Sequence, residues 1–258
     1  MSLFPAILLG AFLCCALMFG LWKVQERTQN AGIVDFGWSA CMALLAVHSM
    51  LVGEGDDYRR ILVGSLGGIW GTRLALHLFY DRVLDKPEDG RYLRLRAHWG
   101  SRANSNFLWF FQAQALLAVV LGLPFFLGAQ AGQIGLRALL GAWLWLIAIV
   151  GETVADRQLA NWRKDPNNKG RTCRSGLWRY SRHPNYFCEW LIWCSFAIVA
   201  LDAPHGYIGL IAPAIMLYLI LYVSGVPYNE AQALASRGDD YREYQRTTNR
   251  FVPWLPRE

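Results

Sequence analysis

Long runs of apolar residues recur along this chain, and they constrain its fold more than any other feature. An α-helix needs about 20 apolar residues to cross the hydrocarbon core of a bilayer, which is roughly 30 Å thick. We therefore expect an all-α, polytopic membrane protein, with residues 1–258 forming one domain of seven transmembrane helices. The seven runs lie at residues 3–22, 33–53, 61–80, 107–127, 136–156, 186–201 and 206–226.

The distribution of lysine and arginine predicts how these spans are oriented. The segments after the first, third and fifth spans and the C-terminal tail together hold 21 of the 25 cations. The opposite side holds three, which are Arg59, Arg60 and Arg137. Because cytoplasmic loops are enriched in lysine and arginine, we expect the N-terminus outside and the C-terminus in the cytosol. The first run lacks a basic leader and a clear cleavage site, so we interpret it as a retained helix.

Net charge and cysteine spacing exclude two classes of function. The net charge of +6 would suit nucleic acid, but the cations cluster in loops on one predicted side, which favours a membrane surface. None of the six cysteines forms a CxxC pair, so we expect free thiols packed as small apolar groups. His183 has no second histidine or cysteine at ligand spacing. We therefore expect no nucleic-acid partner and no metal site.

Polar and ionisable side chains recur inside the predicted spans at helical spacing. Such groups are costly at membrane depth and usually face a cavity or a partner. In each of four spans they lie three, four or seven residues apart, which places them on one helix face. A structural network is the alternative for any single span, but four such faces near the cytosolic ends favour a shared polar chamber. The residues are Asp35 and Trp38; Arg73, His77 and Tyr80; Glu152, Asp156 and Arg163; and Asn185, Glu189 and Trp193.

The predicted loop 157–185 carries eight cations in 29 residues. Arginine side chains suit phosphate oxygens, and a helix predicted to begin at Pro184 would point free N–H groups at the same region. Interleaved aromatic residues, such as Trp162 and Trp178, favour a shaped site for a polyanion such as a dinucleotide. The alternative is an ordinary loop that sets topology and touches lipid headgroups. The chain has neither GxGxxG nor a Walker motif, so a nucleotide would be held outside a Rossmann or P-loop frame.

Several motifs, taken in order, resemble one family of membrane enzymes. The run GLWRYSRHPNY at residues 176–186, followed by Glu189, resembles the C-terminal signature of steroid 5-alpha-reductases and related sterol reductases. The resemblance extends over nearly the whole chain and is closest to the bacterial branch of that family. The other matching motifs are VDFGWS at 34–39, EDGRY at 88–92, GVP at 225–227 with Glu230, YREYQRT at 241–247 and FVPW at 251–254.

This resemblance implies a seven-helix, NADPH-dependent reductase of a carbon–carbon double bond conjugated to a ketone. The implied reaction is 5-alpha-reduction of a 3-oxo-Δ4-steroid or a similar apolar enone that enters from the bilayer. The implied location is the bacterial inner membrane, with a monomeric protein whose NADPH site faces the cytosol. Residues 150–258 would form most of the NADPH-binding part, and residues 1–130 most of the substrate part.

The resemblance also implies roles for individual residues of the cofactor site. Glu230 stands where the animal enzymes have a tyrosine, and we include it among the cofactor-binding candidates. The choice of NADPH over NADH would rest on Arg163, Arg171 or Arg174 meeting the 2′-phosphate. The positions that match the NADPH pocket of the family are Arg91, Asp156, Arg163, Arg171, Asn185, Glu189 and Trp193.

The substrate half departs from the family pattern. The animal enzymes use a glutamate on the second helix and a tyrosine on the third to polarise the steroid ketone. This chain has Asp35 near the first position and Trp70, His77 or Tyr80 near the second. Tyr80, His77 or a protonated Asp35 could donate a hydrogen bond to the developing enolate. The candidates for substrate contact are Trp38, Trp70 and Arg73.

Two other classes of function fit parts of the sequence. Membrane methyltransferases that use S-adenosylmethionine and act on prenylated or lipid thiols share an RHPxY-type run, but Asn185 and Glu189 favour a reductase. A transporter or lipid-binding protein would line a path with ionisable residues. Here the charged groups crowd to one predicted side instead of continuing across the bilayer, which disfavours a path.

Overall fold

The structure is a computed structural model that describes residues 1–257. Within that range all regular structure is helical and no strand occurs, which confirms the predicted all-α class. The chain divides into two compact units, and each is described separately. The first unit comprises Met1–Leu139 and Phe196–Ala212, and the second comprises Leu140–Ser195 and Pro213–Glu258.

Six helical segments of the described chain are long and apolar enough to cross a membrane, in keeping with an integral, multi-pass membrane protein. The predicted span 186–201 lies in α8, Pro184–Ala200, a helix of 17 residues that is shorter than any of the six. The count of seven spans and their orientation stay predictions. The six segments are α1, Leu3–Thr28; α2, Ile33–Val52; α3, Asp57–Arg82; Gly90–Gly128; α7, Leu136–Lys164; and Gly206–Arg237.

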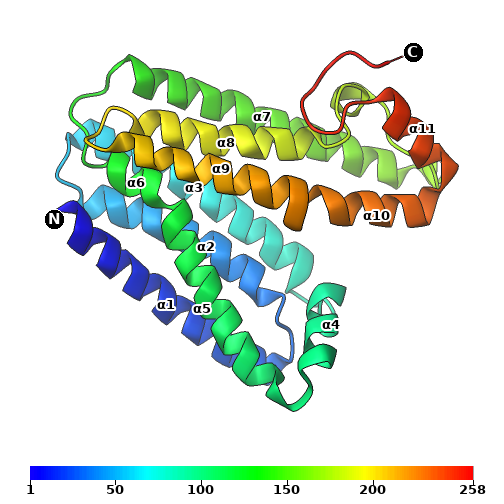
Figure 1. The fold of residues 1–258 in the computed structure, drawn as a ribbon, viewed down its shortest axis with the longest axis horizontal. Coiled ribbons are helices and arrows are strands. Elements are labelled where there is room, and N and C mark those ends of the chain that lie inside the picture. Colours follow the sequence, from blue (N-terminus) through cyan, green and yellow to red (C-terminus); the bar gives the residue numbers. More distant parts are fainter. Residues whose placement is uncertain (258) are drawn as a thin grey trace. The chain divides into compact units, whose positions relative to one another are not determined.

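In the first unit, α2 packs against α1, α3 and α5 (Figure 1). Glycines at helical spacing along α3 set the close approach of α2. A Cβ atom at Gly71 would lie 2.7 Å from the backbone nitrogen of Ala43, and one at Gly67 would lie 2.6 Å from the Cβ atom of Ala46. Small residues at such a seam let two helix backbones approach closely, which is a common packing mode in membranes.

The segment Gly90–Gly128 is built from three helices, which are α4, Gly90–Trp99; α5, Ala103–Leu121; and α6, Leu123–Gly128. A 3₁₀ turn, Gly100–Arg102, separates α4 from α5, and Gly100 has a φ of +52° that favours glycine. Aspartates cap two helices of this unit: Asp56 accepts hydrogen bonds at the start of α3, and Asp89 does so at the start of α4.

The structure corrects the placement of Arg59, which the sequence assigned to an external loop. Arg59 lies in the first turn of α3, and its side chain is 0% exposed. Its Nη2 atom donates to the Asp202 carboxylate at 3.0 Å and to the carbonyl oxygen of Val199. Arg59 is therefore a buried, paired cation and not a free charge at the membrane surface.

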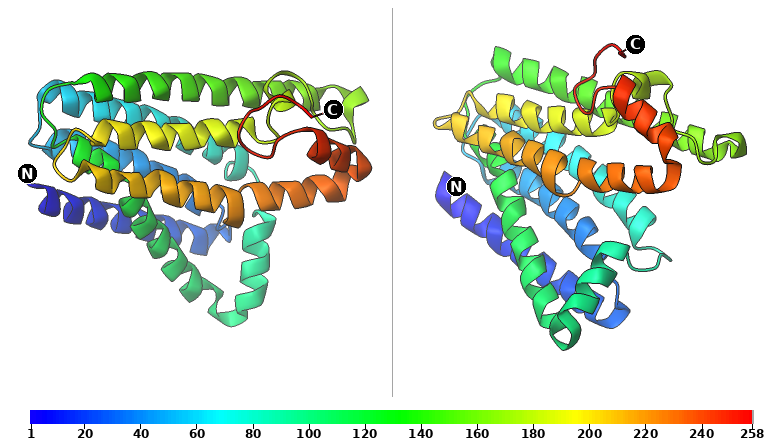
Figure 2. Two further views of the ribbon diagram at one scale, coloured as in Figure 1. Left: turned by 45° about the horizontal axis from the view of Figure 1, so that its top comes forward. Right: turned by 45° about the vertical axis from the view of Figure 1, so that its right-hand side comes forward.

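The second unit contains most of α7 and α8, with α9, Ile211–Tyr218, α10, Val226–Arg237, and α11, Asp239–Thr247. The views in Figures 1 and 2 show α8 running between α7 and the α9–α10 pair. A π-helical turn, Leu219–Val223, joins α9 to α10. Between α7 and α8 the chain makes two 3₁₀ turns, Pro166–Asn168 and Gly176–Arg179.

Candidate functional site

A cavity of about 610 Å³ lies in the second unit, where α7 ends and the following loop meets the C-terminal end of α10. Its volume is within the range of roughly 300–1,000 Å³ typical of small-molecule sites. Five of its lining residues are cationic, and Asp165 is the acidic one. The cations are Arg163, Lys164, Lys169, Arg171 and Arg237.

Local hydrogen bonds explain how nearby residues of one loop come to surround this cavity. After α7 ends at Lys164, the Asp165 carboxylate accepts the backbone N–H of Asn167 at 2.9 Å and shapes the first 3₁₀ turn. The Asn168 side chain donates to the carbonyl oxygen of Trp162 at 3.0 Å, which satisfies an acceptor at the helix end. Gly170, with a φ of +78°, then reverses the chain. The cations after the turn are thereby carried back beside those that end α7.

The Trp162 indole supplies the most specific polar feature of the cavity wall. Its Nε1 atom is buried and has no hydrogen-bond partner among residues 1–257. Buried polar groups in proteins are nearly always satisfied, so an unpaired donor at a cavity wall points to a bound molecule or water as its acceptor. An oxygen-rich anion would satisfy this donor and the surrounding cations together.

Only part of the predicted cofactor set lines this cavity. Arg163 and Arg171 do so. Arg174 instead pairs with Asp240 at 3.0 Å and lines a separate pocket of about 290 Å³. Arg91 belongs to the first unit. Of the candidates for the 2′-phosphate, the cavity therefore brings together Arg163 and Arg171.

Other predicted cofactor residues form a polar line between α7 and α8. The Asn185 amide donates to Asp156 Oδ1 at 3.1 Å, which joins the two helices. Along α8, the Trp193 indole donates to Glu189 Oε1 at 3.0 Å across one helical turn. The Asn185 Oδ1 atom is buried without a hydrogen-bond partner among the described residues, so this line keeps one unused acceptor. Glu152 lies one turn before Asp156 on α7 and is buried.

Glu230 lies in a third polar cluster that ties α10 to the start of α8. Its Oε1 atom is 3.0 Å from Arg182 Nε and 3.3 Å from His183 Nε2, and its Oε2 atom accepts from Gln245 at 3.2 Å. The contact between Arg182 and Glu230 is an ion pair and not a hydrogen bond, because the Nε–H group does not point at the carboxylate oxygen. Burial lowers the pKa of His183, although Glu230 acts in the opposite direction. No group of three or more histidine, cysteine or acidic residues in the described chain could hold a metal ion.

In the first unit, Asp35 is the centre of a compact charged cluster. Its Oδ2 atom accepts from Arg82 and, at 3.0 Å, from Arg91, while its Oδ1 atom accepts the Tyr92 hydroxyl at 2.7 Å. Arg91 also binds Asp89 at 3.1 Å; burial alone would raise the pKa of Asp89, but the contacts with Arg91 lower it overall. Both Asp35 oxygens therefore act as acceptors, which leaves no oxygen free to donate to a ketone.

The other predicted substrate residues lie along α2 and α3. Trp38 and Trp70 meet edge to face, with ring centroids 6.4 Å apart, and Trp70 is fully buried against Phe196. Tyr80 is 62% exposed, and His77 is also exposed. Arg73 is half-buried on the same helix. The tryptophans are thus packed together, whereas the two predicted hydrogen-bond donors are exposed residues.

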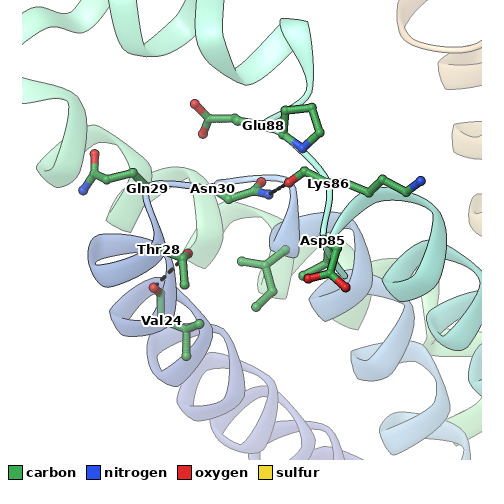
Figure 3. Close-up of a pocket in the computed structure, with 10 residues that line it drawn as sticks. Val24, Thr28, Gln29, Asn30, Asp85, Lys86 and Glu88 are labelled. Carbon is green, nitrogen blue, oxygen red and sulfur yellow. Dashed lines mark hydrogen bonds between the residues drawn. The ribbon is translucent and has the colours of Figure 1, made fainter.

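A second, smaller pocket of about 300 Å³ lies in the first unit, between the α1–α2 turn and the loop before α4 (Figure 3). Asn30 donates to the carbonyl oxygen of Lys86 at 3.2 Å and links the two segments. Glu88 accepts the N–H of Ala31 at 2.7 Å and pairs with Arg96, which lies on α4. These bonds join the two segments at this junction, and Lys86 is the one cation that lines the pocket.

Sequence reasoning missed several residues of both sites. Arg237 is far along the chain from the cation-rich loop, and no local pattern linked it to that loop. The unpaired nitrogen of Trp162 is visible only once its surroundings are known. For the Asp35 cluster, the EDGRY motif contained Tyr92, and that motif was the available signal for its role.

Comparison with known proteins places the chain in a family. A family model described as "Protein of unknown function (DUF1295)" matches residues 21–248. An uncharacterized protein of Schizosaccharomyces pombe is 26% identical over 265 residues, which cover 91% of this chain and 76% of the yeast protein. A second uncharacterized protein of that yeast is 34% identical over 73 residues, covering 22% of this chain and 26% of its own length. No solved structure matches. Because the family model spans most of the chain, the protein belongs to the DUF1295 family.

Proposed function

We propose that this protein uses NADPH to reduce a carbon–carbon double bond conjugated to a ketone in an apolar substrate, such as a 3-oxo-Δ4-steroid. The observation that carries the proposal is the cavity of about 610 Å³ in the second unit, which is lined by five cations and by Trp162, whose indole nitrogen is unpaired. The motif resemblance to steroid 5-alpha-reductases supports the same reaction class. The matching family is described as being of unknown function, so membership of it does not support one reaction over another.

The residues of this cavity fit the phosphate-bearing part of NADPH. Arg163 and Arg171 offer planar guanidinium groups that can bind phosphate oxygens in pairs. Lys169 and Arg237 add positive charge at other points of the wall. The Trp162 ring can stack on a base or donate to a phosphate or ribose oxygen. No strand occurs in residues 1–257, so this mode of binding would be unlike a Rossmann site.

When bound, NADPH would supply a hydride to the β-carbon of the enone, and a proton would reach the α-carbon, so that NADP⁺ and the saturated ketone leave. Negative charge develops on the ketone oxygen during the first of these events. A protein donor at that oxygen lowers the barrier. His77 and Tyr80 are favoured for that role over Asp35, because both Asp35 oxygens already accept hydrogen bonds.

The proposal includes seven spans, with the cation-lined cavity facing the cytosol and the protein in the bacterial inner membrane. As a helix of 17 residues, α8 is about 26 Å long and reaches the lower limit of helices that cross a bilayer. The apolar substrate would enter from the lipid and the charged cofactor from the cytosol. We propose that a monomer suffices.

Thermal unfolding of the detergent-solubilised full chain tests the cofactor. NADPH should raise the unfolding temperature, because a ligand at 100 times its Kd stabilises a folded protein by about 2.7 kcal/mol. The variant Arg171→Ala should weaken binding of NADPH. Arg242→Ala is the matched control, since it removes the same charge from an exposed residue of α11 that pairs with Asp239 outside the cavity.

The outcomes separate the candidate functions. Stabilisation by S-adenosylmethionine but not by NADPH would favour the methyltransferase, and stabilisation by neither would favour a transporter or lipid-binding protein. An equal loss of NADPH and NADH binding in Arg171→Ala would reject Arg171 as the contact of the 2′-phosphate. If NADPH binds, incubation with Δ4-3-ketosteroids should yield a product that has gained two hydrogen atoms, detected by mass spectrometry.

A further inference from the structure

The C-terminal tail, residues 248–257, is held by hydrogen bonds to residues that immediately precede α8. The Ser181 hydroxyl donates to the carbonyl oxygen of Phe251 at 2.7 Å. The backbone N–H of Trp254 donates to the carbonyl oxygen of Tyr180 at 2.9 Å. Two ordered bonds of this kind hold the tail in one place, so its exposed side chains form a defined surface.

The packing of Phe251 sets the depth of that surface. Its ring lies 5.6 Å from the ring of Phe187 and 6.0 Å from that of Trp190, and it is buried. Because α8 begins at Pro184, these partners lie about 5 Å and 9 Å along the helix. If α8 spans the membrane from the cytosolic side, as proposed above, that depth is the boundary between headgroups and acyl chains.

Three of the exposed side chains of the tail, at positions 252, 254 and 255, are apolar, and they lie between the exposed Arg250 and Arg257. Trp254 and Leu255 are each 70% exposed, and Val252 is also exposed. Together with Tyr180 and Pro253, the tryptophan and the leucine line a shallow pocket of about 280 Å³. Tryptophan and tyrosine are enriched where a protein meets the membrane–water interface, because each combines a large apolar ring with one polar group.

A basic pocket of about 290 Å³ borders this apolar surface along the chain. Arg179 lines it and immediately precedes Tyr180, while Pro256 lines it and immediately follows Leu255. The Arg179 side chain makes no ion pair or hydrogen bond with another residue of the described range 1–257. The remaining lining residues are Arg174, which is partly neutralised by Asp240, and Thr247 and Thr248.

We propose that this tail is a binding site for an anionic phospholipid of the cytosolic leaflet. The phosphate would lie at Arg179, beside the threonines, and the acyl chains would lie on Trp254 and Leu255. Charge complementarity argues for an anionic lipid, because the Arg179 side chain has no acidic partner and lies at the edge of an apolar surface at headgroup depth. The inference rests on the proposed direction of α8 but not on the proposed reaction.

Native mass spectrometry of the delipidated full chain in detergent tests the site. Phosphatidylglycerol and phosphatidylcholine with identical acyl chains should both bind, the former more tightly. Arg179→Ala should weaken phosphatidylglycerol binding about fivefold, the effect expected of one arginine near an anionic lipid, and leave phosphatidylcholine unchanged. Trp254→Ala should weaken both lipids, because it removes apolar contact. Arg242→Ala, the matched loss of charge on α11, should change neither.

Equal binding of the two lipids by the wild-type chain, or no effect of Arg179→Ala, would overturn the proposal. A wild-type dimer that Trp254→Ala converts to monomer, with lipid binding unchanged, would show that a second copy covers the surface instead. The assay contains no NADPH. A failed NADPH shift together with selective lipid binding by the wild-type chain would therefore refute the reaction alone, whereas an intact NADPH shift in a wild-type chain that shows no lipid selectivity would refute this site alone.

Discussion

Replacing Asp202 by alanine should destabilise the first unit strongly, because Asp202 is the carboxylate that pairs with the buried Arg59. The Arg59 side chain is 0% exposed, and its Nη2 atom donates to Asp202 at 3.0 Å. Its Nε and Nη1 atoms have no hydrogen-bond partner among the described residues. Without Asp202, the guanidinium would keep a bond to the Val199 carbonyl oxygen and no negative charge.

The magnitude follows from the burial of the two partners. Removing one member of a buried ion pair typically costs about 3–5 kcal/mol. Asp202 is 23% exposed, so solvent screens part of the interaction, and we expect the lower end, about 3 kcal/mol. For a chain of this size, that corresponds to a fall in unfolding temperature of about 6–12 °C.

Thermal unfolding in detergent, followed by circular dichroism, measures this effect. Arg137→Ala is the control, because Arg137 is 62% exposed and lies 3.6 Å from the other oxygen of Asp202. We expect that variant to lose less than about 1 kcal/mol. In the double variant Arg59→Met with Asp202→Ala, no charge remains buried, and much of the lost stability should return.

Two results would refute the reasoning. A fall of only one or two degrees in Asp202→Ala would show that Arg59 is satisfied by water or by another group. A double variant that is less stable than Asp202→Ala would show that the arginine contributes packing that methionine cannot replace, and not an uncompensated charge.

Three further predictions follow from the packing, the loop and the proposed donors. Gly71→Leu should destabilise the α2–α3 seam by at least about 1–3 kcal/mol and lower the unfolding temperature, because its Cβ atom alone would lie 2.7 Å from a backbone nitrogen; an unchanged temperature would contradict the packing. Asp240 accepts the N–H of Thr172 at 2.7 Å, and although burial acts to raise the pKa of Asp240, this bond and Arg174 lower it overall. The lowered pKa contributes stability that is present above the unfolded value, near pH 4, and lost as pH falls through the folded value, so Asp240→Asn should flatten the acid side of a plot of unfolding temperature against pH. Tyr80→Phe should lower kcat about 10²–10³-fold with NADPH binding unchanged if Tyr80 is the enolate donor, whereas an unchanged kcat would move that role to His77.

The wall of the cation-lined cavity shows where local sequence stops being informative. The density of arginine and lysine in the loop 157–185 predicted a site for anions, and Arg163 and Arg171 do line the cation-lined cavity. Arg174 belongs to the same charged run but pairs with Asp240 in another pocket, and Arg237 completes the wall from a separate helix. The charge count of a loop cannot say which of its side chains face the same space.

The Asp35 cluster shows a second limit. Its helical position and the cost of a carboxylate at membrane depth indicated that Asp35 has a partner or a function. The structure gives it Arg82, Arg91 and Tyr92 as partners. That arrangement changes the chemistry expected of Asp35 from donor to acceptor, and no spacing within its own helix could reveal it.

By itself, the sequence determined the helical class, the approximate bounds of the six long apolar helices and the concentration of cations after α7. These properties are local, since each depends on residues within a few turns of one helix or one loop and on the thickness of a bilayer. Only the tertiary structure decided that Arg59 is buried against Asp202, that Asp35 accepts three donors, and that Trp162, whose indole nitrogen is unpaired, lines the same cavity as five cations. Those outcomes depend on which charges meet after distant segments pack, because a buried polar group is stable only beside a partner that its own helix does not supply.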